Sequence, residues 1–257
     1  MSRLDGLVAV VTGGGRGIGR AIALEMAREG AKLAISSRTR GELDSVVSEI
    51  SDLGSEGLSV VADAMSRNES KEPVRRAFSH FGKVDILVNN VGGRVPGDQD
   101  PFSHDDIVFE SNLVLNLTSA YWTTREVLPL MRKQQYGRIL TIGSGYAKRS
   151  GGALAYTTAK HGLIGFTRAL AAQVANEHIT VNCLCPGWTN TALVDWESMG
   201  ESRGTDSDEA YLWAASQNLQ ERILEPEELG PMAALLAAPE SAGITGQVIS
   251  VDGGYKV

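Results

Sequence analysis

The chain has few residues that commonly bind metals and no long apolar segment. Its 257 residues include two cysteines and four histidines, and no group of them has the spacing of zinc ligands. The apolar run at residues 7–11 ends at a glycine cluster, so it is too short for a membrane span and lacks a secretory cleavage pattern. The sequence therefore predicts no metal site and no membrane segment.

The two cysteines and the charge balance narrow the setting further. Cys183 and Cys185 stand two apart in an expected strand, where side chains share a face but cannot easily meet the geometry of a disulfide. We expect reduced core thiols and a cytoplasmic protein. With 24 basic against 31 acidic residues, the net charge is −7 and the chain lacks the overall positive field that holds nucleic acid.

What the sequence does contain is an alternation of short β-branched runs and longer segments of helical period. Strands are expected at residues 7–11, 32–36, 58–62, 84–89, 138–142, 180–184 and 247–251. Helices are expected at residues 17–29, 40–53, 70–81, 111–133, 154–177 and 226–237. This repeated order predicts one α/β domain over residues 1–257, a parallel sheet with helices on both faces.

The segment 188–225 differs from the rest of the chain. It is polar, lacks a steady period, and carries Trp188, Trp196, Tyr211 and Trp213. A long irregular insertion in a compact domain is usually functional. We therefore expect an irregular lid that binds the substrate, with packing of the loop on itself as the alternative for its tryptophans.

A glycine-rich turn joins the first expected strand to the first expected helix, with the pattern Thr12-Gly13-x-x-x-Gly17-x-Gly19. Glycines let the backbone approach a pyrophosphate closely, and a helix N-terminus offers free N–H groups and the positive end of its dipole. The spacing differs from the standard dinucleotide fingerprint. The strand before it and the helix after it nevertheless predict dinucleotide binding rather than a simple turn.

The end of the second expected strand indicates which dinucleotide binds. NAD sites of this type tend to place an acidic residue there, but this strand ends in Ser36-Ser37-Arg38. Ser37, Arg38 and Arg16 could hold a 2′-phosphate through charge-assisted hydrogen bonds. We expect NADP(H) to be preferred, with NAD(H) left open. The alternative for Arg38 is a solvated helix start.

Tyr156 and Lys160 stand four apart on an expected helix and so project from one face. A free tyrosine titrates near pH ~10, and a nearby ammonium lowers that pKa by favouring the phenolate. Such a phenol can give a proton to a carbonyl oxygen or take one from an alcohol. The pair can arise by chance, but the expected strand that ends at Ser144 precedes it, and catalytic groups gather at the carboxyl ends of parallel strands.

From residue 7 to 254 these motifs resemble the short-chain dehydrogenase/reductase superfamily, specifically its 3-oxoacyl reductase-like branch. The matching segments are Thr12-Gly13-x-x-x-Gly17-x-Gly19, Asp63, Asn89-Asn90-Val91-Gly92 (Val in place of the usual Ala), Asn112, Ser144, Tyr156-x-x-x-Lys160, Pro186-Gly187-x-x-x-Thr191 and Asp252-Gly253-Gly254. The resemblance implies a Rossmann-type doubly wound sheet of about seven strands in the order 3-2-1-4-5-6-7. It also implies a homotetramer built on the helices at 111–133 and 154–177.

The resemblance implies roles for individual residues. Ser144 would bind the substrate oxygen, Tyr156 would transfer the proton, and Lys160 would bind the nicotinamide ribose. Asn112 would hold a water that links Lys160 to solvent. The cofactor contacts expected from the loop and the resemblance are Gly13, Gly15, Arg16, Gly17, Ile18, Gly19, Ser37, Arg38, Asp63, Ala64, Asn90, Val91, Gly92, Tyr156, Lys160, Pro186, Gly187, Thr189 and Thr191. The expected substrate contacts are Ser144, Tyr146, Tyr156, Trp188 and Trp196.

These expectations predict an NADP(H)-dependent oxidoreductase that moves a hydride between the nicotinamide and a ketone or secondary alcohol. The substrate is expected to be a free small molecule, apolar or alicyclic, because the lid is acidic and would disfavour docking of an acidic carrier protein. Two alternatives remain open. One is a reductase of 3-oxoacyl thioesters, and the other is a dinucleotide-binding sensor or scaffold without turnover.

Overall fold

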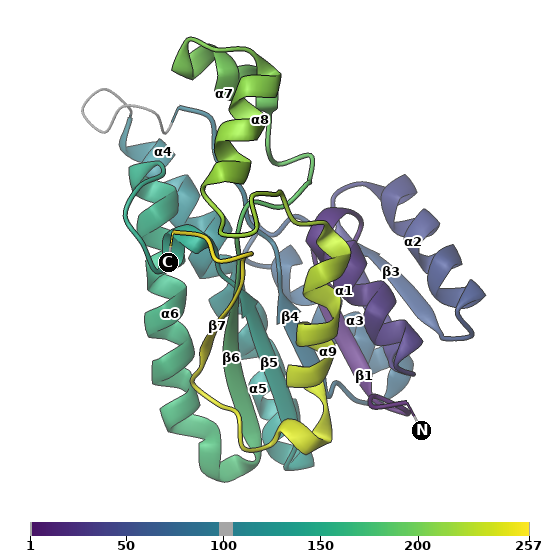
Figure 1. Cartoon of the computed structure of the whole chain (residues 1–257). Helices are drawn as coiled ribbons and strands as arrows, with labels where there is room; N and C mark the ends of the chain where they lie inside the picture. Colours follow the sequence, from purple (N-terminus) through teal and green to yellow (C-terminus); the bar gives the residue numbers. More distant parts are fainter. Residues whose placement is uncertain (1, 98–104, 257) are drawn as a thin grey trace.

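The computed structural model describes residues 2–97 and 105–256. These residues form a seven-stranded parallel sheet in the order β3-β2-β1-β4-β5-β6-β7 (Figure 1). The strands are β1 (Val8–Thr12), β2 (Lys32–Ser37), β3 (Gly57–Val61), β4 (Ile86–Asn89), β5 (Gly137–Ile142), β6 (Ile179–Pro186) and β7 (Val248–Val251). The predicted strand order is confirmed.

The apolar run of β1 fits its place in the middle of the sheet. All five residues of β1 are buried, as expected for a central strand that is covered on both faces. β1 pairs with β2 on one side and with β4 on the other, with Val10 opposite both Ala34 and Leu87. The order of the strands reverses between β1 and β4. In open α/β sheets such a reversal opens a crevice at the carboxyl ends of the strands, which is where ligands bind.

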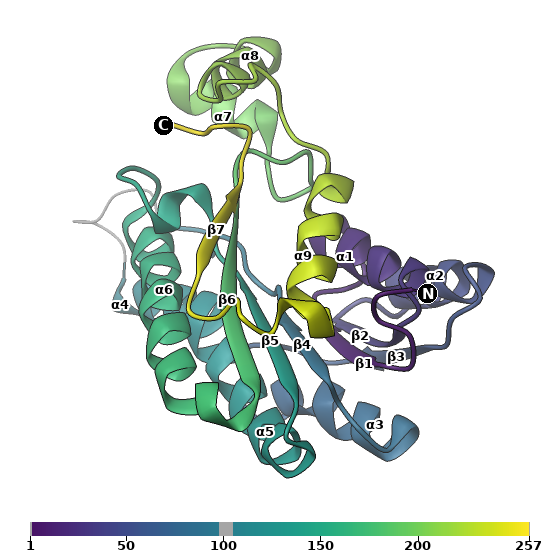
Figure 2. The ribbon, with the colours of Figure 1, turned by 60° about the horizontal axis from the view of Figure 1, so that its bottom comes forward.

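Helices cover both faces of the sheet (Figures 1 and 2). They are α1 (Gly17–Arg28), α2 (Arg40–Asp52), α3 (Glu72–Phe81), α4 (Asp106–Leu113), α5 (Ser119–Gln134), α6 (Leu154–Val174), α7 (Trp196–Arg203), α8 (Ser207–Ser216) and α9 (Gly230–Ala237). One apolar core joins α1, α2 and α9 to the sheet, and a second joins α3, α5 and α6 to it. None of the helices in the described part of the chain is long and apolar enough to cross a membrane.

The helix expected at 111–133 is present, as part of a continuous helical stretch in which a π-helical turn at Val114–Thr118 lies between α4 and α5. Another expectation about the elements was wrong. The segment 188–225 is not irregular, because it contains α7 and α8, which pack against each other and stand beyond the carboxyl edge of the sheet (Figure 2).

At the opposite edge of the sheet a buried arginine joins three segments. Arg138, at the start of β5, is only 3% exposed. Its guanidinium donates hydrogen bonds to the carbonyls of Gly137, His178, Ala238 and Pro239 at 2.9–3.4 Å. It forms no ion pair with a carboxylate of the described residues, and burial lowers its pKa. Hydrogen bonds from this one cation therefore hold the starts of β5 and β6 and the loop after α9.

We expect Arg138→Met to lower the free energy of unfolding by about 2 kcal/mol, because several buried carbonyls lose a charged donor. Urea unfolding of this variant and of Arg132→Met measures the effect. Arg132 is the matched control, since its side chain is half exposed and pairs with Glu177 at the surface. An Arg138→Met protein that equals the wild type would show that the cost of burying the cation cancels its hydrogen bonds.

Candidate active site

The glycine-rich turn after β1 forms a cradle in which side chains do not fit. Gly13 and Gly17 have φ angles of +65° and +54°, which favour glycine. A Cβ on Gly13 would lie 2.9 Å from the amide nitrogen of Asn90, and one on Gly19 would overlap the carbonyl of Gly13. Arg16 precedes α1 without a side-chain cap on its N-terminus. The turn therefore presents bare backbone at a helix N-terminus, which fits the pyrophosphate of a dinucleotide.

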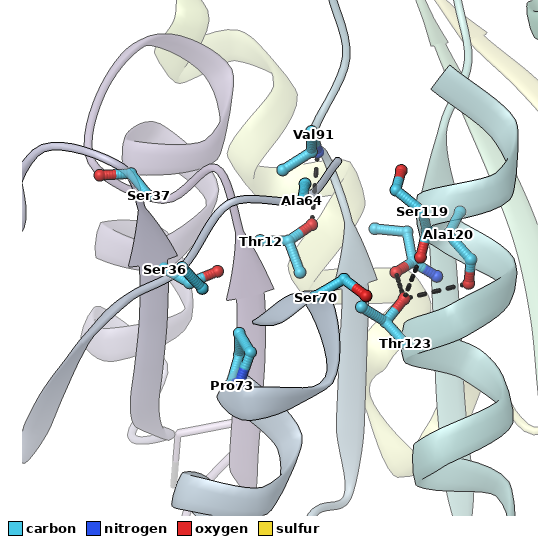
Figure 3. Close-up of a pocket in the computed structure, with 12 residues that line it drawn as sticks. Thr12, Ser36, Ser37, Ala64, Ser70, Pro73, Val91, Ser119, Ala120 and Thr123 are labelled. Atoms are coloured by element: carbon cyan, nitrogen blue, oxygen red, sulfur yellow. Dashed lines mark hydrogen bonds between the residues drawn. The ribbon is translucent and has the colours of Figure 1, made fainter. Parts of the chain in front are cut away.

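Asn90 braces this cradle from the end of β4. Its amide donates to the carbonyls of Thr12 and Gly13 at 3.0 and 3.1 Å. The Thr12 hydroxyl in turn accepts hydrogen bonds from the backbone N–H groups of Asn90 and Val91 at 3.1 and 3.3 Å. Figure 3 shows the bond from Val91. The side chain of Asn90, expected to contact the cofactor, is thus engaged with the cradle's backbone and positions it.

A small, partly open pocket lies beside the cradle, between the ends of β1, β2 and β4 and the helices α3 and α5 (Figure 3). Its lining includes Ser37, Ala64 and Val91, three residues expected to contact the cofactor. Asp63, the expected adenine contact, accepts a hydrogen bond from the backbone N–H of Met65 at 2.9 Å. Small side chains and hydroxyl groups dominate the lining, so the surface next to the cradle is polar and free of bulky side chains.

Charged residues surround the same corner. Arg38 is exposed after β2 and forms no ion pair within the described part of the chain. Arg16 is two-thirds exposed and lies 3.6 Å from a carboxylate oxygen of Glu42, a residue of the first turn of α2. The sequence analysis did not identify Glu42, because this acid belongs to the next helix rather than to the end of the strand.

The structure brings Ser144, Tyr156 and Lys160 together at the carboxyl edge of the sheet. Ser144 follows β5, and its side chain forms a hydrogen bond with the phenol of Tyr156 on α6. The Lys160 ammonium, on the same helix, lies 5.7 Å from the centre of the Tyr156 ring. It donates a hydrogen bond to the carbonyl of Ile142 at 2.8 Å. The predicted cluster is therefore assembled, with a hydroxyl, a phenol and an ammonium side by side.

The electrostatics of this cluster differ from the expectation. We expected Lys160 to lower the pKa of Tyr156, but burial raises the pKa of Tyr156, and the hydrogen bond with Ser144 only partly opposes this. Burial also lowers the pKa of Lys160 to about 8, while the thiols Cys183 and Cys185 oppose that shift. Desolvation of both groups is the dominant effect, and spacing along a helix does not reveal it.

The asparagine beside Lys160 is Asn116, not the expected Asn112. A Cβ on Gly92 would lie 2.8 Å from the Lys160 nitrogen and 2.9 Å from the amide oxygen of Asn116. Asn112 instead accepts a hydrogen bond from the N–H of Val95 and donates one to the carbonyl of Val108. Asn116 lies in the π-helical turn, a kind of distortion that is frequent at functional sites.

The segment after β6 links the two halves of the site. The methyl group of Thr191 would lie 3.4 Å from a Cβ on Gly17, so this segment reaches the glycine cradle. Gly187 packs on the backbone of Asp252, where a Cβ would come within 2.7 Å of the carbonyl oxygen. The Thr189 hydroxyl donates to the carbonyl of Gly187 at 3.1 Å. The expected nicotinamide segment thus lies against the cradle, with Thr189 bonded to the segment itself.

An aromatic cluster stands over the Ser144 side of the site. The ring of Trp188 lies 6.1–6.3 Å from those of Tyr146, Trp196 and Trp213. The backbone N–H of Tyr146 donates to the Ser144 hydroxyl at 3.2 Å, which connects this cluster to Ser144. The indole nitrogen of Trp188 is buried without a hydrogen-bond partner among the described residues. The tryptophans of the segment 188–225 thus contact one another as well as Tyr146.

The two cysteines, Cys183 and Cys185, lie on β6. Both thiols are free and fully buried, and their sulfur atoms are 3.8 Å apart. A Cβ on Gly143 would come within 3 Å of both sulfur atoms, so the close approach of β5 to β6 requires glycine there. The two cysteines thus lie in the core as expected, and their reduced state stays a prediction.

Comparisons with known proteins agree with this geometry. The family model described as short chain dehydrogenase matches residues 7–201. A tropinone reductase homolog of Arabidopsis thaliana is 37% identical, with 99% of this chain and 94% of the relative covered. The D-beta-hydroxybutyrate dehydrogenase of Cupriavidus necator is 33% identical, with 98% of each chain covered. The crystal structure of levodione reductase is 29% identical, with a TM-score of 0.91 and 98% of each chain covered. The chain therefore belongs to the short-chain dehydrogenase/reductase family of oxidoreductases.

Proposed function

We propose that the protein is an NADP(H)-dependent oxidoreductase that interconverts a small ketone and its secondary alcohol, with Tyr156 as the proton donor and acceptor. The observation that carries this proposal is the contact of Ser144, Tyr156 and Lys160 at the sheet edge where the glycine cradle opens. A nicotinamide bound over this cluster would supply or accept the hydride. The remaining proton must then move through the protein.

The chemistry of each side chain follows from its surroundings. Since burial raises the pKa of Tyr156, the phenol carries its proton at neutral pH and can donate it to a carbonyl oxygen during reduction. The Ser144 hydroxyl, already bonded to that phenol, can donate to the same oxygen and stabilise the charge that develops there. Lys160, held by the Ile142 carbonyl, keeps a positive charge on the same side of the site as the Tyr156 ring. We assign the return of the proton from solvent to Lys160 together with Asn116.

This assignment predicts a contrast between two asparagines one turn apart. Asn116→Ala is expected to lower kcat about 100-fold with little change in the Kd of the cofactor, because the path that reprotonates Lys160 is broken. Asn112→Ala removes comparable hydrogen bonds to backbone and is expected to lower kcat less than about 3-fold. Steady-state rates and cofactor titrations distinguish the two. Equal losses of kcat in both variants would contradict the role of Asn116 in returning the proton to Lys160.

Support for NADP(H) comes from the corner next to the cradle. Arg16, Ser37 and Arg38 lie there, and Arg38 has no acidic partner within the described part of the chain. A guanidinium binds phosphate through paired, charge-assisted hydrogen bonds, so these residues suit a 2′-phosphate. No acidic residue stands at the end of β2, where the ribose hydroxyls of NAD are usually bound.

The aromatic cluster favours a small, largely apolar substrate. Tyr146, Trp188 and Trp196 border the Ser144 side of the site, and their rings suit an alicyclic or other apolar body. The relatives named for tropinone reduction, levodione reduction and hydroxybutyrate oxidation all carry names of small-molecule carbonyl chemistry. We also infer a homotetramer, since Ile107, Tyr121 and Leu154 leave apolar side chains exposed on α4, α5 and α6.

A panel of carbonyl compounds with NADPH and with NADH tests the function. We expect at least one cyclic or small aliphatic ketone to oxidise the reduced cofactor. The decrease in absorbance of the reduced nicotinamide measures this oxidation. Preferential turnover of 3-oxoacyl thioesters would point to the thioester reductase instead. Tight cofactor binding without oxidation by any carbonyl compound in the panel would favour a sensor or scaffold and contradict the proposal.

A further inference from the structure

The corner that suits the 2′-phosphate also contains a carboxylate. Glu42, in the first turn of α2, turns towards the glycine cradle, and its side chain is only one-third exposed. A Cβ on Gly15 would lie 3.3 Å from a carboxylate oxygen of Glu42 and 3.0 Å from the Ser37 hydroxyl oxygen. The other carboxylate oxygen lies 3.6 Å from Arg16. Glu42, Ser37 and Arg16 therefore converge directly over Gly15.

This arrangement weakens the positive charge that a phosphate would meet. Of the two arginines at this corner, Arg16 is already paired with Glu42, and Arg38 alone carries an uncompensated charge. A phosphate bound between Arg16 and Ser37 would carry negative charge next to the carboxylate, and like charges at such distances repel. Ribose hydroxyl groups carry no charge and can donate hydrogen bonds to a carboxylate. Glu42 therefore disfavours the 2′-phosphate but not the ribose of NAD.

We propose that Glu42 is a specificity-determining residue that limits the preference for NADP(H) and keeps the site open to NAD(H). The inference rests on the proposed function, since it requires that a dinucleotide binds at the glycine cradle. The acid acts from the first turn of α2 rather than from the end of β2. It faces the same corner from the neighbouring element, so the cofactor preference reflects a balance between Glu42 and the pair Arg16 and Arg38.

The test is a titration of the full-length protein with NADPH and with NADH. The fluorescence of the reduced nicotinamide reports binding in both titrations. Glu42→Gln keeps the shape of the side chain and removes its charge. We expect it to lower the Kd of NADPH about ten-fold. The Kd of NADH should change less than two-fold or rise. Asp52→Asn is the matched control, because it removes an exposed acid from the last turn of the same helix and should leave both Kd values unchanged.

The outcomes separate this inference from the function on which it rests. If the ratio of the Kd for NADH to the Kd for NADPH does not rise in Glu42→Gln, the role of Glu42 is overturned. Binding of both dinucleotides by that variant would still support dinucleotide binding at the glycine cradle. Failure of the wild type to bind either dinucleotide would overturn both. An equal rise of the ratio in Asp52→Asn would show a general effect of net charge and would also overturn the specific role.

Discussion

Replacing Tyr156 by phenylalanine is expected to lower kcat at least about 1,000-fold while the Kd of NADPH stays within a few-fold of the wild type. The substitution removes one oxygen atom from a buried ring and leaves the ring itself in place. Without the phenol oxygen, the carbonyl group of the substrate loses its proton donor. Of the two hydroxyl groups that would bind the carbonyl oxygen, only that of Ser144 remains. Steady-state kinetics with a ketone identified in the panel, together with a cofactor titration, measures both quantities.

Tyr211→Phe provides the matched control for that experiment. Tyr211 lies on α8, where its ring packs at 5.2 Å from that of Trp196, and its side chain is partly exposed. The same loss of a phenolic oxygen there should change kcat less than about 3-fold. If Tyr156→Phe retained more than a tenth of the wild-type kcat, another group would have to supply the proton, and the assignment of Tyr156 would be abandoned.

Lys160→Met is expected to abolish turnover and, at the same time, to remove a pH dependence from the stability of the protein. The pKa of Lys160 is about 8 in the folded chain against 10.5 when unperturbed. Between these two values the unfolded chain binds more protons than the folded one, so this group makes the free energy of unfolding rise with pH across that window. Below pH 8 the cost of burying the ammonium is fully present.

The size of the effect follows from the same shift. From pH 7 to about pH 10.5 the free energy of unfolding of the wild type should gain roughly 3 kcal/mol relative to Lys160→Met. Urea unfolding of both proteins at several pH values gives this difference, in which contributions shared by the two proteins cancel. Lys133→Met, at an exposed position near the end of α5, should run parallel to the wild type. A difference between wild type and Lys160→Met that does not change with pH would contradict the burial argument.

Much of the fold could be read from the sequence because its strands are buried on both faces. The apolar runs around β1 and β5 gave their positions to within a residue or two, and the alternation with helices gave the parallel topology. The segment 188–225 was different. Its helix α8 buries Ala210, Ala214 and Ala215 rather than large apolar residues, so no apolar stripe marks it. The signal that was present is the cap, in which Asp206 accepts a hydrogen bond from the N–H of Glu209.

The same contrast applies to the site. Motif order located Ser144, Tyr156 and Lys160, because each follows a strand or stands on one helical face. Asn112 and Asn116 also share a helical face, so spacing alone does not decide between them. The packing of Gly92 against Lys160 and Asn116 distinguishes them, and this contact between distant parts of the chain leaves no pattern in the sequence. The upward shift of the Tyr156 pKa was missed for a related reason, since desolvation depends on all the chain that surrounds the phenol.

The bracing of the glycine cradle by Asn90 and Thr12 has a thermodynamic consequence. Four hydrogen bonds connect the loop after β1 to the end of β4 before any ligand arrives. A dinucleotide that binds there has little backbone left to order, so little of its binding free energy is lost to conformational entropy on the protein side. The cradle is therefore preorganised for a ligand that binds at its backbone.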